Sequence, residues 1–311
     1  MKHLFPILPI VLYSLFILSS CSQNEPLIET EHAPLEFKLN IKGGTPITRA
    51  TGTMYKAFVF IYKAEDTTSP IILEDELYGD NTILYYTPAE DFARSAGYNV
   101  VAVATTDVTL QERLKTPISQ TNLLDLIQNT VDLGTDGDEY MVSGGLGEVT
   151  FNNPSKSILL YRNVCQLQLI VTDKTDQTTG KYKSITASFD VPDQTYIFSS
   201  DVRGSTGIPG TAADVTKTVI LSKPSETENV WTHSPCYFFE KNDGLTLNIQ
   251  AIRDGDAGEE TYNYKVVLVK TERNTIYQVN AGLNLTGIKV IAGSSIDWSG
   301  TVNDSQEILP E

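Results

Sequence analysis

Hydrophobic residues at every second position constrain the fold of this chain more than any other feature. The first such run is LEFKLNIK, residues 35–42, whose odd positions are all apolar: Leu35, Phe37, Leu39 and Ile41. Successive side chains of a β-strand point to opposite faces of a sheet, so this alternation predicts a strand with one buried face. YKAFVFIYKA (residues 55–64) and NVVAVATT (99–106) are apolar at almost every position and predict strands buried on both faces.

Segments with a helical pattern are few. TNLLDLIQNT (Thr121–Thr130) predicts one helix, with Leu123, Leu124 and Ile127 on one side and Thr121 as its N-terminal cap. PAEDFARSAG (88–97) predicts a helical turn between two strands.

A second set of alternating runs begins at SILLYRNVCQLQLIVTD, residues 157–173, and continues to the end of the chain. Turns rich in Gly, Asp and Asn separate these runs at the spacing of β-sandwiches. We therefore predict an all-β chain with two β-sandwich domains in tandem, residues 35–154 and 155–311, divided near Pro154.

The N-terminus has the features of an export signal. Met1-Lys2-His3 is followed by an uncharged run, Leu4–Leu18, that is shorter than the roughly 20 residues of a membrane-spanning helix. LSSC then ends at Cys21 and matches the bacterial lipobox, in which the cysteine is lipidated and becomes the new N-terminus. We predict a signal peptide over residues 1–20, lipidation at Cys21 and a flexible stalk over 21–34, with a plain secretory signal as the alternative. Ser22 after the cysteine favours the outer membrane.

The charge of the chain limits its partners. The net charge is −16, and removal of the signal peptide takes away Lys2, leaving 22 basic against 39 acidic residues, or −17. Such a charge disfavours binding to nucleic acid and electrostatic attachment to anionic lipid.

No constellation of catalytic or metal-binding residues emerges. Of three histidines only His233, predicted in a loop, lies beyond the stalk. Cys165 alternates in phase with a run of aliphatic residues, which predicts a core position. A disulfide between Cys165 and Cys236 is the alternative. GTDGDE (134–139) and RDGDAGEE (253–260) lack full calcium-loop spacing and predict acidic hairpin turns. We expect no enzyme, cofactor or metal; a hydrolase would have no identifiable site.

Several motifs in a fixed order resemble one known family. The lipobox and first strand precede a Thr-Arg-Ala connector (48–50) and the FVFIYKA strand. RNVCQLQL (162–169), ERNTIYQVNAGLNLTG (272–287) and a closing Asp-Trp (297–298) follow. This pattern resembles the fimbrillins that form the type V pili of Bacteroidales.

The resemblance implies two transthyretin-like β-sandwich domains, an outer membrane lipoprotein precursor and, later, a place in a surface pilus that supports cell adhesion. It also implies that an arginine-specific surface protease cuts between Arg49 and Ala50, so that strand 35–42 leaves with Leu35, Phe37, Leu39 and Ile41; the alternative is that Arg49 is an ordinary solvated loop residue. The C-terminal segment of another subunit would then fill the vacated groove by donor-strand exchange.

One segment departs from the family pattern. The tail SGTVNDSQEILPE (299–311) has few aliphatic residues, unevenly spaced, and is a poor donor strand. Such a tail suits a tip subunit, an anchor subunit that keeps its lipid and is not cut, or a subunit whose donor strand includes IKVIAGSSI (288–296). A glycan-binding β-sandwich lipoprotein is a further alternative, although Trp231 and Trp298 are the only tryptophans for an aromatic platform.

Overall fold

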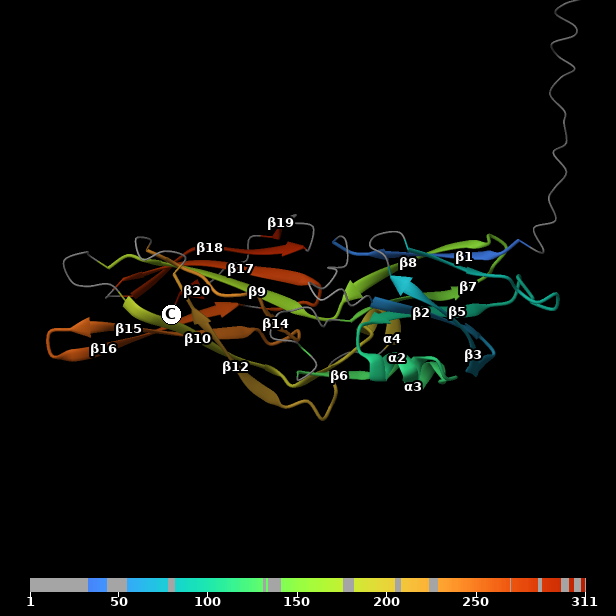
Figure 1. Ribbon diagram of the computed structural model, residues 1–311, viewed down its shortest axis with the longest axis horizontal. Helices are drawn as coiled ribbons and strands as arrows, with labels where there is room; N and C mark the ends of the chain where they lie inside the picture. The colour runs from blue at the N-terminus through green and yellow to red at the C-terminus, as the bar shows by residue number, and fades with distance from the viewer. Residues whose placement is uncertain are drawn as a thin grey trace, which may run out of the picture.

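The computed structural model confirms an almost entirely β fold built from several sheets (Figure 1). It describes residues 33–43, 55–77, 82–130, 133, 141–175, 182–204, 208–223, 229–268 and 270–284, and the backbone alone of 287–297, 302–304 and 309–310. Among the described residues no helix is both long and apolar enough to cross a membrane.

The first sheet contains seven strands in the order β3-β2-β5-β7-β8-β1-β4. Their bounds are β1 (Leu35–Ile41), β2 (Tyr55–Lys63), β3 (Asp66–Leu77), β4 (Thr82–Tyr86), β5 (Tyr98–Thr105), β7 (Val142–Val149) and β8 (Ser155–Arg162). Strands β7 and β8 pair only at Val142↔Arg162 and Ser143↔Tyr161. The sheet therefore splays beyond that point, and β4-β1-β8 faces β3-β2-β5-β7 across a shared apolar core.

Two short helices cover the outer face of β2 and β5. They are α2 (Val108–Leu114) and α3 (Gln120–Leu124), and they lie below these strands in Figure 1. Phe58, Phe60 and Tyr62 of β2 point into this second apolar layer. The strands β2 and β5 are thus buried on both faces, as their continuous apolar sequences predict.

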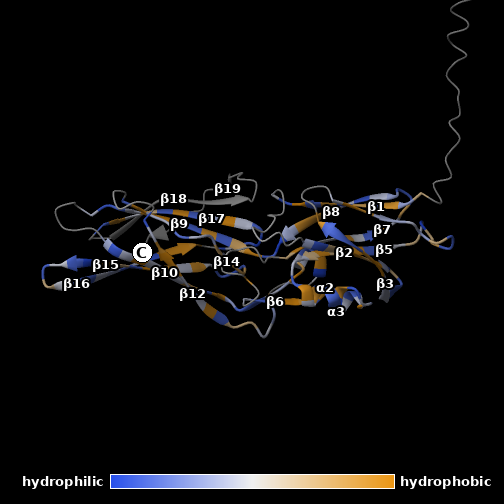
Figure 2. Cartoon of the chain, in the orientation of Figure 1, coloured by the Kyte–Doolittle hydropathy of each residue, from blue (hydrophilic) through white to orange (hydrophobic). Residues whose placement is uncertain are grey.

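The remaining strands form two further sheets that enclose a core of their own. One sheet has the order β12-β10-β15-β16-β20, and the other has β13-β9-β17-β18-β19 with β14 also paired to β9. The bounds are β9 (Cys165–Asp173), β10 (Tyr182–Pro192), β12 (Asp214–Leu221), β13 (Val230–Trp231), β14 (Cys236–Phe238), β15 (Leu245–Gly255), β16 (Gly258–Leu268), β17 (Thr275–Asn284), β18 (Gly287–Asp297), β19 (Val302–Asp304) and β20 (Leu309–Pro310). Figure 2 shows apolar and polar residues mixed along these strands, as strands with one buried face require.

The sequence run that was expected to open the second domain is divided between the two halves. Strand β8 pairs with β1 and β7 of the first sheet, and only β9 belongs to the second half. Pro154 therefore precedes a strand of the first sheet, and the chain passes between the halves at Asn163 and Val164. A two-strand ladder of β6 (Ile127–Asn129) with β11 (Gln194–Tyr196) adds a second connection. The short helix α4 (Ser200–Arg203) follows it and contacts β7.

The predicted helix over Thr121–Thr130 is wrong in its length and its cap. Helix α3 ends at Leu124, and Ser119 caps it by accepting a hydrogen bond from the backbone N–H of Asn122. Ile127 lies instead in β6, whose partner β11 is far away in sequence and draws these residues out of the helix.

The predicted helical turn over residues 88–97 consists of hydrogen-bonded turns, from Phe92 N–H to the Ala89 carbonyl and from Ala96 N–H to the Ala93 carbonyl. Helix α2 was not predicted. Asp107 caps it by accepting hydrogen bonds from two backbone N–H groups.

Candidate assembly site: the groove that holds the first strand

Strand β1 lies inside the first sheet although it is the first strand of the chain. It runs parallel to β8, from Glu36↔Ser155 to Ile41↔Leu160, and antiparallel to β4, from Leu35↔Tyr86 to Leu39↔Thr82. A backbone hydrogen bond from Glu36 to the Pro154 carbonyl (2.9 Å) begins the contact with β8. Strand β4 is the edge strand of the sheet, and β1 lies between β4 and β8.

The inward side chains of β1 are buried as the alternation predicts. Leu35, Phe37 and Leu39 are 0% exposed and Ile41 is 5% exposed. The Phe37 ring meets the Phe151 ring edge to face, with 5.8 Å between the ring centroids. These four side chains therefore form part of the core between the two parts of the sheet. We call the space that they occupy the β1 groove.

The outward face of β1 is polar and half-buried. Glu36, Lys38 and Asn40 alternate with the buried residues. The Asn40 side-chain amide donates to the Ser157 hydroxyl of β8 at 2.8 Å. The strand is thus held by backbone pairing on two sides, by apolar packing on one face and by few polar contacts on the other.

The end of β1 is held by three consecutive residues of β8. The backbone N–H of Lys42 donates to the Leu160 carbonyl at 2.9 Å. The Lys42 ammonium lies 5.1 Å from the centre of the Tyr161 ring, and the Arg162 guanidinium donates to the Lys42 carbonyl at 3.1 Å. Arg162 is itself 0% exposed. We call Leu160, Tyr161 and Arg162 the terminal clamp.

Two sequence motifs that carried the family resemblance meet beside the terminal clamp. The backbone N–H of Arg162 donates to the Asn274 side-chain carbonyl at 3.1 Å, and Asn274 N–H donates to the Val164 carbonyl at 2.8 Å. Asn274 has a φ of 60°, a left-handed conformation that asparagine tolerates better than most residues. RNVC and ERNT are therefore contact partners that fix the turn from β8 into β9.

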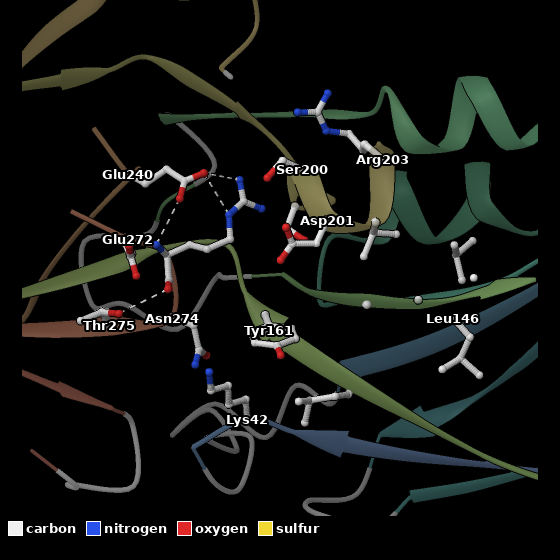
Figure 3. A pocket seen from close by; sticks show the side chains of 18 of the residues that line it. Lys42, Leu146, Tyr161, Ser200, Asp201, Arg203, Glu240, Glu272, Asn274 and Thr275 are labelled. Carbon is white, nitrogen blue, oxygen red and sulfur yellow. Dashed lines mark hydrogen bonds and ion pairs between the residues drawn. The ribbon is translucent and has the colours of Figure 1, made fainter. Parts of the chain in front are cut away.

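Arg273 of the same motif makes an ion pair with Glu240 and hydrogen bonds to the end of β11. The Arg273 guanidinium contacts the Glu240 carboxylate at 2.9 Å and also donates to the Tyr196 and Ile197 carbonyls. Glu240 and Arg273 both line a polar cavity, and Figure 3 shows the Glu240 side chain at its wall. Arg273 thus fastens the segment after β11 to the second half.

The cavity lies at the junction of the two halves and has a volume of about 870 Å³. Lys42 and Tyr161 line it on one side and Ser200 and Asp201 on the other. The end of β1 therefore borders open space, whereas the apolar part of the strand is enclosed.

Cys165 and Cys236 are both free thiols. Cys165 is buried in phase with Leu167 and Leu169, which confirms it as a core residue, and burial raises the pKa of its thiol well above the usual value. Cys165 pairs with Phe238 and Cys236 pairs with Leu167, so the two cysteines are diagonal across the β9–β14 ladder. Diagonal neighbours are more widely separated than the Cβ atoms of a disulfide.

His233 lies between the two short strands that pair with β9. Its Nε2 accepts a hydrogen bond from the Leu169 backbone N–H at 2.9 Å, and its Nδ1 contacts the Ser234 carbonyl. Burial lowers the pKa of His233 below its ordinary value. The loop histidine therefore replaces a strand carbonyl where the ladder is interrupted.

The acidic segment at residues 253–260 is a hairpin turn between β15 and β16, as predicted, and Arg253 pairs with Glu260 across it. Within the described ranges no group of His, Cys, Asp or Glu side chains is placed to hold a metal ion. Residues 134–139, Cys21, Arg49 and Ala50 lie outside the described residues.

Sequence reasoning did not single out Arg162. The signal was nevertheless present, because Arg162 is in phase with the buried residues Ile158 and Leu160 of β8. A charged residue that continues an apolar face must find polar partners inside the fold.

The architecture is that of an all-β protein made of packed sheets, and comparison with solved structures finds the same fold in fimbrial and candidate cell adhesion proteins of Bacteroides and Porphyromonas. No protein-family model matches the sequence, and no curated protein is significantly similar to it.

A candidate cell adhesion protein from Bacteroides eggerthii aligns with a TM-score of 0.59 at 16% identity, over 90% of this chain and 97% of that one. A C-terminally truncated form of the tip fimbrial protein Mfa3 from Porphyromonas gingivalis aligns with a TM-score of 0.53 at 10% identity, over 85% and 100%. A candidate cell adhesion protein from Bacteroides ovatus aligns with a TM-score of 0.50 at 11% identity, over 86% and 98%. The expected resemblance to fimbrial proteins is therefore confirmed in the fold.

Proposed function

We propose that this chain is a structural subunit of a surface fimbria and acts in cell adhesion as part of it. In this proposal Cys21 carries the lipid of an outer membrane precursor, and an arginine-specific surface protease cuts between Arg49 and Ala50. Strand β1 then leaves, and an extended segment of another pilus subunit takes its place. The fold shared with a tip fimbrial protein supports this assignment.

The observation that carries the proposal is the position of β1. The strand lies between β8 and β4 in its sheet, its apolar face is buried, and the Thr-Arg-Ala connector follows it in the sequence. Burial of a large apolar side chain stabilises by about 1.5–3 kcal/mol, so four such residues contribute roughly 6–12 kcal/mol. A typical domain is stable by only about 5–15 kcal/mol in total.

The loss of β1 would therefore leave a groove that demands a replacement. Strand β4 would lose its neighbour in the sheet, and β8 would expose a row of unpaired backbone groups. Addition of a strand from another chain satisfies those groups and refills the apolar space. This role requires no catalysis, cofactor or metal from the chain itself.

The proposal is tested by the N-terminal residue of protein extracted from cells. We expect Ala50 in wild-type assemblies that resist detergent. Arg49→Ala should fold normally, since a surface substitution changes stability by about 0.5 kcal/mol or less, but should keep Cys21 and fail to assemble. Arg113→Ala, an exposed arginine of α2, is the matched control and should be cut and assembled like the wild type.

The alternative outcomes separate the competing functions. If wild-type protein always begins at Cys21 while fimbriae still form, the chain is an uncut anchor subunit. If it remains monomeric after the cut and binds polysaccharide, it is a glycan-binding lipoprotein. A Cys21→Ala variant should appear in the soluble fraction, and a variant that stays in the membrane and incorporates fatty acid would contradict lipidation at Cys21.

A further inference from the structure

We propose that the terminal clamp recognises the C-terminal end of any strand in the β1 groove and selects a strand that ends with lysine or arginine. The ligand class is an extended segment with four alternating apolar residues followed directly by a cation, as in LEFKLNIK. This inference rests on the proposed function, because it specifies the partner that replaces β1.

The clamp contacts all three parts of Lys42. Leu160 accepts from its backbone N–H at 2.9 Å, Arg162 donates to its carbonyl at 3.1 Å, and the Tyr161 ring faces its ammonium at 5.1 Å. The first two contacts fix the register of the strand. The third distinguishes a cation from other side chains, since the face of an aromatic ring attracts positive charge.

Arg162 makes the register strict because it is completely buried. Its guanidinium contacts a carbonyl that belongs to the strand in the groove and not to the wall. When β1 leaves, this buried cation loses that acceptor, and loss of a partner by a buried charged group is costly. A replacement strand must therefore extend far enough to place a carbonyl at the Lys42 position.

The pattern that the clamp selects is absent from residues 290–311 of this chain, which favours a strand from a different protein. Residues 290–311 contain no lysine or arginine, so the terminal segment has no cation to offer to Tyr161. Nor does SGTVNDSQEILPE provide four apolar residues at alternate positions. The clamp thereby favours a partner subunit with a basic residue at the end of its donor strand.

The clamp is tested first in the intact, uncut chain by hydrogen exchange of the β1 amides. Lys42→Glu and Tyr161→Ala should each accelerate exchange of Glu36–Lys42 about 2- to 5-fold, the effect of one cation–π contact. Arg162→Met should accelerate it at least about 10-fold, because a hydrogen bond from a charged donor is lost. Amides of β5 should keep their protection.

Lys38→Glu is the matched control, since it makes the same charge change on the outward face of the same strand, away from the clamp. It should alter β1 exchange by less than about 2-fold. If Lys42→Glu and Tyr161→Ala stay within the range of Lys38→Glu, the clamp does not read the cation and the proposal is refuted. These two surface changes decide the question even if Arg162→Met fails to fold.

The second test uses full-length protein cut after Arg49 and fluorescent peptides. LEFKLNIKGG should enter the groove, and the same peptide with Glu in place of the second Lys should bind at least about 5-fold more weakly. A peptide of residues 299–311 should not compete. Equal binding of that tail peptide would overturn the assignment to a different protein. If the cut releases no strand, the proposed function fails, while the exchange data on the intact chain still test the clamp.

Discussion

Replacement of Phe37 by alanine should destabilise the uncut protein more than any other single change in β1. Phe37 is 0% exposed, and its ring packs against Phe151 with 5.8 Å between centroids. Truncation of a buried phenylalanine costs about 3–5 kcal/mol, of which the aromatic pair contributes about 0.5–1.5 kcal/mol. The loss is a large fraction of the stability of a typical domain.

The assay is unfolding in urea, in which a loss of stability lowers the midpoint at an unchanged slope. Lys38→Ala is the control, because Lys38 is the next residue and points to the opposite, half-buried face. Its effect should be within about 0.5 kcal/mol. A cost below about 1 kcal/mol for Phe37→Ala, or an equal cost for Lys38→Ala, would show that the inward face of β1 is not part of the core.

A second measurement connects this substitution to assembly. Once β1 has been cut off and replaced, residue 37 is no longer in the protein, so assembled Phe37→Ala and wild-type protein should have the same stability. A persistent difference between the assembled forms would show that β1 remains in its groove.

Three further changes have defined outcomes. Burial lowers the folded-state pKa of His233. The contribution of the neutral His233 side chain to stability should therefore be complete above about pH 6.5 and be lost as the pH falls through the folded-state pKa. His233→Gln should remove this part of the pH dependence of the urea midpoint. Gly144→Ala should cost about 1–3 kcal/mol in the same unfolding assay, because a Cβ there would lie 2.0 Å from a backbone oxygen of β8, whereas Gly147→Ala has open space and should be neutral within about 0.5 kcal/mol. Mass spectrometry after alkylation in denaturant without reductant should find both Cys165 and Cys236 labelled, and a mass two hydrogens lower with no label would indicate a disulfide.

Local sequence patterns were sufficient to predict β1, β2 and β5, but not the neighbours of these strands, and they missed β3 and β4. The alternation in residues 35–42 follows from burial of one face, and the structure confirms it residue by residue. The parallel pairings of β1 with β8 and of β9 with β17 join segments far apart in the chain. A period of two specifies which side chains are buried and carries no information about which strand lies alongside.

The wrong helix prediction for residues 121–130 has the same cause, which is pairing with a strand far away in the sequence. Leu123, Leu124 and Ile127 have helical spacing, but the three residues of β6 gain backbone pairing with β11 that the isolated segment does not contain. Helix propensity is a weak preference that tertiary pairing overrides. Conversely, the cap at Asp107 is a local signal, and attention to it would have predicted α2.

The groove was predicted in part. Its apolar lining followed from β1 itself, whereas the terminal clamp depends on Arg162, a charged residue at a buried position of β8. Charge alone suggests a surface side chain, whereas the Lys42 carbonyl is one of the polar partners that the guanidinium finds inside the fold.

The parallel pairing of β1 with β8 has a mechanical consequence. A strand seated in this groove and pulled along its own axis loads its hydrogen bonds to β8 together, in shear, and does not open them one after another from an end. Strand β8 continues within two residues into β9, which pairs with β17 in the second half. Tension applied to the seated strand therefore passes into the sheets of both halves along one continuous stretch of backbone.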